Sequence, residues 1–159
     1  MGSIAVNDGK ELVLSSQTKA LWERRERELY AWAKRDKRKK KDKHTVMLES
    51  FMVDAELYPV LSQLRRMQMT TEFSCAGVSL QDDPLDHSLY AYITLHTSEQ
   101  TEAFVRFAAG YMKHRLLVSY EPARKRYDLS SFFIGHNRSF CLLMQRCTEL
   151  YEQALTAKS

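Results

Sequence analysis

The chain has 159 residues, of which 44% are hydrophobic and 28% charged, and its formal net charge is +4 at pH 7. This apolar content excludes a chain that is disordered throughout, and no apolar run approaches the about 20 residues that cross a bilayer. The beginning of the sequence also lacks the apolar segment of a secretory signal peptide. We therefore expect a cytoplasmic protein without a membrane partner, built as one packed domain with an appendage.

The positive charge is concentrated in the N-terminal part of the sequence. Residues 1–46 hold 13 Lys and Arg against 7 Asp and Glu, whereas residues 47–159 hold 11 against 13. The excess basicity therefore belongs to the appendage and not to the core. We place the boundary at residue 46, between a hairpin or tail with a basic amphipathic helix (1–46) and a core domain (47–159).

The cysteines predict reduced thiols and no metal site. They are odd in number, at positions 75, 141 and 147, in a chain without a secretion signal, so a disulfide framework is not expected. None of them forms a Cys-x-x-Cys pair, which argues against a structural zinc site.

The appendage reads as a short hairpin or loose terminus followed by a helix. Asp8-Gly9 between two short apolar runs predicts a turn within residues 3–16. Residues 17–43 contain no Gly or Pro and predict a helix, whose apolar side at Leu21–Ala33 offers a docking surface for a partner protein or a second copy. The helix then becomes a basic run that suits phosphate groups of nucleic acid, although a solvated helix end explains it equally. The candidate RNA contacts in this run are Lys37, Arg38, Lys39, Lys40 and Lys41.

The core predicts an alternation of helices and strand pairs. A helix led by Asp54 as N-cap is expected to end near Met67. It is followed by a strand that starts at Met69 and breaks at Ser74, and by a second strand at 88–96. A helix capped by Ser98 comes next, and then strands at 115–121 and 127–135 and a last helix at 137–157. This order predicts an α+β fold with a single mixed or mostly antiparallel sheet packed with helices.

Two further polar segments of the core are candidate sites. The turn before the last strand is basic and flanked by Tyr120 and Tyr127, so its side chains suit RNA, or simply form an ordinary basic hairpin; these are Arg124, Lys125 and Arg126. An acidic loop after the first strand suits a cation or a general base, although such residues also form turns; these are Asp82, Asp83 and Asp86.

The stretch from Met69 to Leu80 is the strongest candidate for a ligand site. It starts like a strand and then breaks into Ser-Cys-Ala-Gly at 74–77. Glycine lets the backbone approach a ligand closely, while serine and cysteine supply a hydrogen-bond donor and a nucleophilic sulfur. Cys75 would be activated if His87 or His96, which flank the next strand, lay across from it. A thiol packed in the core is the alternative.

The order of motifs between residues 50 and 96 is also informative. A helix led by Asp54 precedes Thr-Thr-x-x-Ser-Cys-x-Gly at 70–77 and a strand that ends in a histidine. This order resembles the wybutosine-synthesising methyltransferase family of tRNA modification. The resemblance implies methyl transfer from S-adenosylmethionine to a modified guanosine in tRNA. It also implies cofactor contacts at Thr71, Ser74 and Gly77, and catalytic roles for Cys75 and His96.

Two positions depart from the family pattern. Ala76 stands where the family has Ser, and Val78 stands where it has Arg, which removes a fork for phosphate or carboxylate. Two hypotheses follow. The first is a pocket protein that binds S-adenosylmethionine or a nucleotide at the turn, and RNA through its basic segments. The second is a non-enzymatic nucleic-acid-binding or protein-interaction module.

Overall fold

The computed structural model describes residues 11–37, 44–79 and 88–158. Its first part contains β1 (Leu12–Val13), α1 (Lys19–Ala33), β2 (Thr45–Leu48), β3 (Phe51–Asp54), the short 3-10 helix η2 (Ala55–Leu57) and α2 (Tyr58–Arg66). The second part contains β4 (Thr71–Cys75), β5 (Tyr92–His96), α3 (Glu99–Met112), η3 (Lys113–Arg115), β6 (Leu116–Glu121), β7 (Arg126–Ser131) and α4 (Asn137–Lys158).

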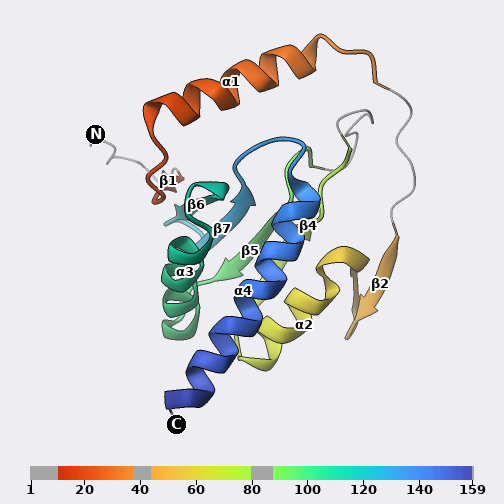
Figure 1. Ribbon diagram of the computed structural model, residues 1–159. Helices are drawn as coiled ribbons and strands as arrows, with labels where there is room; N and C mark the ends of the chain where they lie inside the picture. The colour runs from red at the N-terminus through yellow and green to blue at the C-terminus, as the bar shows by residue number, and fades with distance from the viewer. Residues whose placement is uncertain (1–10, 38–43, 80–87, 159) are drawn as a thin grey trace.

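A five-stranded antiparallel sheet in the order β1-β6-β7-β5-β4 forms one layer, and α2, α3 and α4 pack on one of its faces (Figure 1). The strands β2 and β3 pair only with each other, in a small hairpin beside the main sheet. This arrangement confirms the expected α+β class. The expected order of helices and strand pairs, from α2 to α4, is also confirmed.

The core lies between the sheet and these three helices. Alternate residues of β5 and of the segment before it point into this layer, because side chains on a strand alternate between the two faces; these are Ala91, Ile93 and Leu95, all fully buried. They meet side chains of α2, α3 and α4 that are also fully buried, among them Leu61, Leu64, Phe104, Ala108 and Met144. Among the described residues, no helix is long and apolar enough to cross a membrane.

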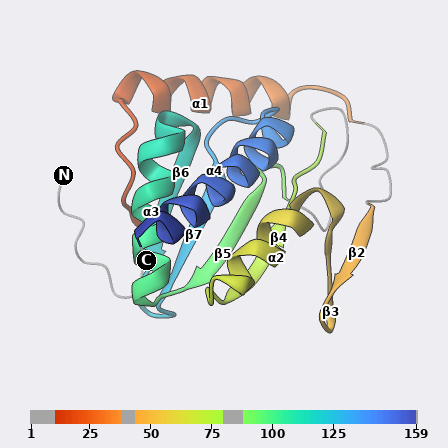
Figure 2. The ribbon, with the colours of Figure 1, turned by 60° about the horizontal axis from the view of Figure 1, so that its bottom comes forward.

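The helix α1 lies outside this layer. It runs along the end of the sheet from which the β7–α4 connection emerges (Figure 2). The segment before it is tied to the sheet, because Leu12 and Val13 pair with β6 and the Leu14 N–H donates to the Val118 carbonyl over 2.8 Å. The turn expected at Asp8-Gly9 lies outside the described residues.

Several element boundaries differ from the sequence-based prediction, and one hairpin is additional. The first helix is α1, which ends at Ala33 instead of continuing to residue 43, and no apolar side chain follows Ala33 to pack a longer helix. The β2–β3 hairpin was not predicted, because its two-residue turn places Glu49 at a φ of 56° without the Gly or Asn that signals such turns. Asp54 makes no capping bond, and α2 starts at Tyr58 after η2. Strand β7 ends at Ser131, four residues earlier than expected.

Candidate functional site: the turn after β4

The turn after β4 is held against the start of α4 by one side chain. The Asn137 amide donates to the carbonyls of Val78 and Leu89 over 3.2 and 2.9 Å, and its oxygen accepts from the Ala91 N–H over 2.7 Å. Gly77 adopts a φ of 82°, and a Cβ built there would lie 2.1 Å from the Asn137 amide nitrogen. Position 77 therefore needs glycine for both its backbone conformation and its space.

The main-chain amides of this turn already have partners within the protein. The Ala76 N–H donates to the Asp54 carboxylate over 2.7 Å, and the Val78 N–H donates to the Ser88 carbonyl over 3.1 Å. The Gly77 N–H points at the Cys75 sulfur, 3.3 Å away. These three amides therefore serve to shape the turn, and a direct contact of theirs with a ligand stays a prediction.

Cys75 and His96 do not come together. Cys75 is buried and lies opposite Tyr92 in the β4–β5 pair, whereas His96 is four residues further along β5. At about 3.3 Å per residue, this offset separates the two by roughly 13 Å. His96 instead lies 3.7 Å from the Glu72 carboxylate, on the face of the sheet away from the helices. His96 therefore does not meet the condition for activating Cys75, and a catalytic role for either residue stays a prediction.

The other two cysteines, Cys141 and Cys147, are also buried, and neither forms a disulfide. Burial raises the pKa of the Cys147 thiol to about 12, so this sulfur stays protonated and unreactive at neutral pH. Within the described ranges, no three His, Cys, Asp or Glu side chains gather as metal ligands would. His87 and the three aspartates of the acidic loop lie outside these ranges.

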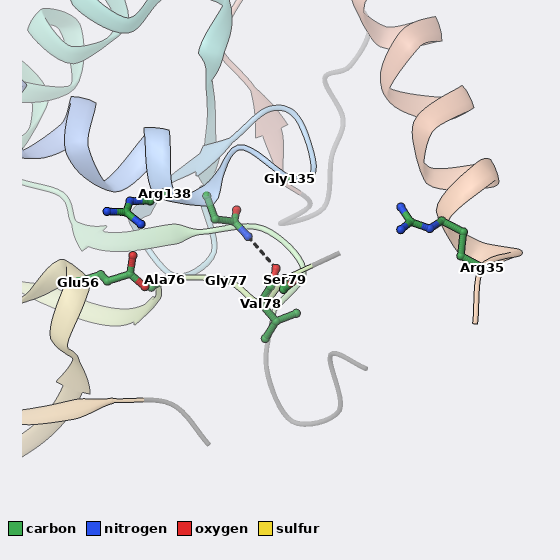
Figure 3. Close-up of a pocket in the computed structure, with 9 residues that line it drawn as sticks. Arg35, Glu56, Ala76, Gly77, Val78, Ser79, Gly135 and Arg138 are labelled. Carbon is green, nitrogen blue, oxygen red and sulfur yellow. Dashed lines mark hydrogen bonds between the residues drawn. The ribbon is translucent and has the colours of Figure 1, made fainter. Parts of the chain in front are cut away.

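A pocket of about 420 Å³ opens beside the turn. Its walls come from four separate segments: the residues after α1, η2, the turn itself and the β7–α4 connection with the first residues of α4. The lining residues are Arg35, Glu56, Ala76, Gly77, Val78, Ser79, Gly135, Asn137 and Arg138. Figure 3 shows Glu56 and Arg138 at one end of this group and Arg35 at the other, with the turn between them.

The pocket is lined by side chains of both charge signs and by the main chain of the Gly77 turn. Glu56 supplies a carboxylate, and Arg138 and Arg35 supply guanidinium groups; all three side chains are exposed. Arg138 lies in the first turn of the 22-residue helix α4, where the N–H groups lack partners within the helix and the helix dipole favours an anion. The pocket can therefore hold a small polar ligand that carries both an anionic and a cationic group.

Of the residues predicted to bind a cofactor, only Gly77 lines the pocket. Thr71 and Ser74 lie earlier on β4, opposite Leu95 and Ile93. Arg138 directly follows Asn137, which starts the last helix. The sequence signal for a helix start could therefore have indicated Arg138 as a site residue. Glu56 carries no signal in the sequence, because nothing there indicates that η2 lies near the turn.

The basic segments differ in how available their charges are. Arg126 is held between two carboxylates, at 2.8 Å from Glu72 and 3.0 Å from Glu121, and only 11% of its side chain is exposed. Its guanidinium is therefore already paired within the protein, and its contact with RNA stays a prediction. Arg124 and Lys125 are exposed on the same hairpin. In the first basic segment, the Lys37 ammonium lies 4.0 Å from the Trp32 ring, and positions 38–41 are outside the described residues.

No protein-family model, no curated protein and no solved structure matches this chain. The function is therefore inferred from the geometry of the pocket and from the sequence resemblance described above for residues 50–96.

Proposed function

We propose that the protein binds S-adenosylmethionine in the pocket beside the Gly77 turn. The observation that carries the proposal is the presence of both a carboxylate, from Glu56, and a guanidinium, from Arg138, in one pocket. This pocket lies beside the Gly77 turn and the start of the long helix α4. The volume of about 420 Å³ lies in the usual range for small-molecule pockets, about 300 to 1,000 Å³.

The charges of the pocket suit the amino-acid end of this ligand. A free α-amino acid group carries a carboxylate and an ammonium on one carbon. Arg138 and the first N–H groups of α4 would bind the carboxylate, because both favour an anion. Glu56 would bind the ammonium. A triphosphate fits less well, because Glu56 would repel it.

Methyl transfer to RNA is the activity that we propose for the bound cofactor. The methyl group on a sulfonium is already electrophilic, so the protein has mainly to hold the acceptor atom in line with it. This step requires neither Cys75 as a nucleophile nor His96 near the pocket. The RNA would lie along the basic side chains near the pocket mouth, Arg35 and Lys37, with Arg124 and Lys125 as a second contact.

Calorimetric titration of S-adenosylmethionine into the protein tests the binding. We expect measurable heat with the wild type, and at least about tenfold weaker binding for Arg138→Ala and Glu56→Gln, since each would lose a charge-assisted hydrogen bond. Arg146→Ala is the matched control, because Arg146 is an exposed arginine further along α4 that does not line the pocket. No heat with the wild type, or equal losses for all three variants, would overturn the proposal.

A non-enzymatic nucleic-acid-binding module is the second candidate, and the exposed side chains of Arg124 and Lys125, which do not line the pocket, support it. RNA binding that weakens steeply with salt, in a protein that shows no heat with S-adenosylmethionine, would support this candidate. RNA affinity that is the same at low and high salt would exclude phosphate contacts under both candidates. A protein-interaction role for α1 would require its release from the core, since Trp22 packs on Phe132 of the same chain.

A further inference from the structure

The contact between α1 and the core is made by charged and aromatic side chains, and on the core side it covers two buried rings, Phe132 and Phe133. None of the 15 residues of α1 is buried. Trp22 meets Phe132 edge to face, with ring centroids 5.0 Å apart, and the Arg24 guanidinium lies 4.1 Å from the centre of the Phe133 ring. Arg25 stacks 4.2 Å from the centre of the Tyr90 ring. The attachment therefore rests on a few ring contacts and not on a continuous apolar seam.

Arg25 is the central residue of this contact. It donates from Nη1 to the Phe132 carbonyl, and its guanidinium lies among the rings of Tyr90, Phe132 and Trp22. Burial lowers the pKa of Arg25. The guanidinium is thus partly removed from water and contacts rings and a carbonyl instead. These contacts compensate for the lost hydration free energy less fully than a carboxylate would.

The same contact contains buried polar atoms without partners. Within the described part of the chain, the buried side-chain atoms that lack a hydrogen-bond partner are Gln17 Oε1, Glu28 Oε1 and Tyr90 OH. Gln17 stands before α1 and donates to the Leu116 carbonyl, Glu28 is in α1, and Tyr90 stacks on Arg25. Docking of α1 therefore leaves one carboxylate oxygen of Glu28 and the Tyr90 hydroxyl buried without a hydrogen-bond partner in the protein. Such a contact opens at a lower free-energy cost than a fully paired one.

The end of α1 reaches the pocket. Arg35 follows α1 by two residues and lines the pocket, whereas the other lining residues belong to the core. Arg35 can contact a ligand there only while α1 is docked. The position of α1 and the closure of the pocket are therefore linked.

We propose that α1 is a strap that undocks from the folded core as a unit, and that in its docked position it closes the pocket with Arg35. The link to a ligand rests on the proposed binding of S-adenosylmethionine. A ligand that contacts Arg35 binds the docked state more tightly and shifts α1 toward that state. When α1 is undocked the ligand can enter or leave the pocket, and when α1 is docked the ligand is retained.

Tryptophan fluorescence reports on this motion selectively, because both tryptophans of the chain, Trp22 and Trp32, lie in α1. In a Trp32→Phe variant, the emission comes from Trp22 alone, while far-ultraviolet circular dichroism reports mainly on the core helices. In a urea titration, we expect the Trp22 emission to shift to longer wavelength at a lower urea concentration than the loss of the dichroism signal. Coincident transitions would overturn the strap, because α1 would then unfold together with the core.

Substitutions made in the Trp32→Phe background separate docking from helix stability. Arg25→Ala should move the Trp22 transition to lower urea and leave the dichroism transition in place. Arg27→Ala is the matched control, because Arg27 is an exposed arginine on the same helix and should move neither. Equal effects of the two substitutions would contradict the role given to the Arg25 contact.

Added S-adenosylmethionine tests the closure. We expect it to raise the urea midpoint of the Trp22 transition, and Arg35→Ala to remove this rise. Calorimetric heat without any rise would overturn the closure while the proposed function stands. No heat in any variant would overturn the proposed function and the closure with it, and the comparison of the two transitions would still decide whether α1 undocks.

Discussion

The two longest helices, α4 and α1, both pack on the same core, but in different ways. Six side chains of α4 are buried between the sheet and the helices α2 and α3, whereas no side chain of α1 is buried. The six are Phe140, Cys141, Met144, Cys147, Thr148 and Tyr151. An apolar stripe at helical spacing predicts both helices, but only the surroundings decide whether the stripe becomes part of a core.

The polar groups at the two contacts differ in the same way. Where α4 meets α2, the Thr148 hydroxyl donates to Gln63 over 3.1 Å, and the Gln63 amide donates to Glu152 over 2.6 Å. Where α1 meets the core, buried oxygens have no partner. A contact with paired polar groups costs more free energy to open than one with unpaired groups, so we expect α1 to open before α4 does. The comparison therefore predicts that substitutions on α4 affect the whole protein and substitutions on α1 affect α1 alone.

Truncation of the α4 core should have the largest effect. Met144 is fully buried, so Met144→Ala should lower the free energy of unfolding by about 2–5 kcal/mol. Urea titration should show the Trp22 emission and the dichroism signal both moving to lower urea. Leu142→Ala is the control on the same helix, because Leu142 is 60% exposed and should change stability by about 0.5 kcal/mol or less. A similar small loss at Met144 would contradict the placement of α4 in the core.

Substitution of the turn glycine should have the next largest effect. Gly77→Ala would force a side chain into a positive φ and against Asn137, and should cost about 1–3 kcal/mol. It should also weaken binding of S-adenosylmethionine, because the turn forms a wall of the pocket. Gly110→Ala offers a matched comparison: position 110 lies within α3 with nothing within 4 Å of an added Cβ, so stability should rise by about 0.4–1 kcal/mol. Urea midpoints of the two variants that move in the same direction would be inconsistent with this geometry.

The smallest effect should be a pH dependence at the attachment of β1. Burial, and then the hydrogen bond with the Asp128 carboxyl, raises the pKa of Glu11, which also accepts from the Ser119 hydroxyl over 2.8 Å. A raised pKa in the folded state means a contribution that is complete below about pH 4.5 and lost as the pH rises through the folded value. The ionised Glu11 then faces Asp128 and Glu121.

Glu11→Gln removes this titration. Relative to the wild type, the variant should gain stability between pH 4.5 and pH 7, by about 0.5 kcal/mol or less. Urea titrations at the two pH values check this. A stability difference between variant and wild type that is the same at both values would show that Glu11 does not titrate in this way.

Local patterns in the sequence predicted most of the core elements, because alternation in β5 and capping by Ser98 depend on neighbouring residues. The Ser98 hydroxyl indeed accepts from the Thr101 N–H over 3.1 Å. The β2–β3 hairpin escaped prediction, since Glu49 and Ser50 form its turn without the usual turn residues.

The sequence could predict only those parts of the candidate site that depend on neighbouring residues of the chain. The small residues before Gly77 indicated the turn, and the sequence also placed the start of the last helix at residue 137. Arg35 and Glu56 reach the pocket because segments distant in the sequence pack together. The sequence alone does not indicate that these segments are close in space. Whether His96 lies across from Cys75 could not be predicted for the same reason, because the strand register decides it.

The most direct test of the pocket is an amide chemical-shift map of the protein titrated with S-adenosylmethionine. We expect the largest shifts at Gly77, Val78, Gly135 and Arg138, and none at His96 on the opposite face of the sheet. Shifts confined to residues around His96, or no shifts at saturating ligand, would contradict the account.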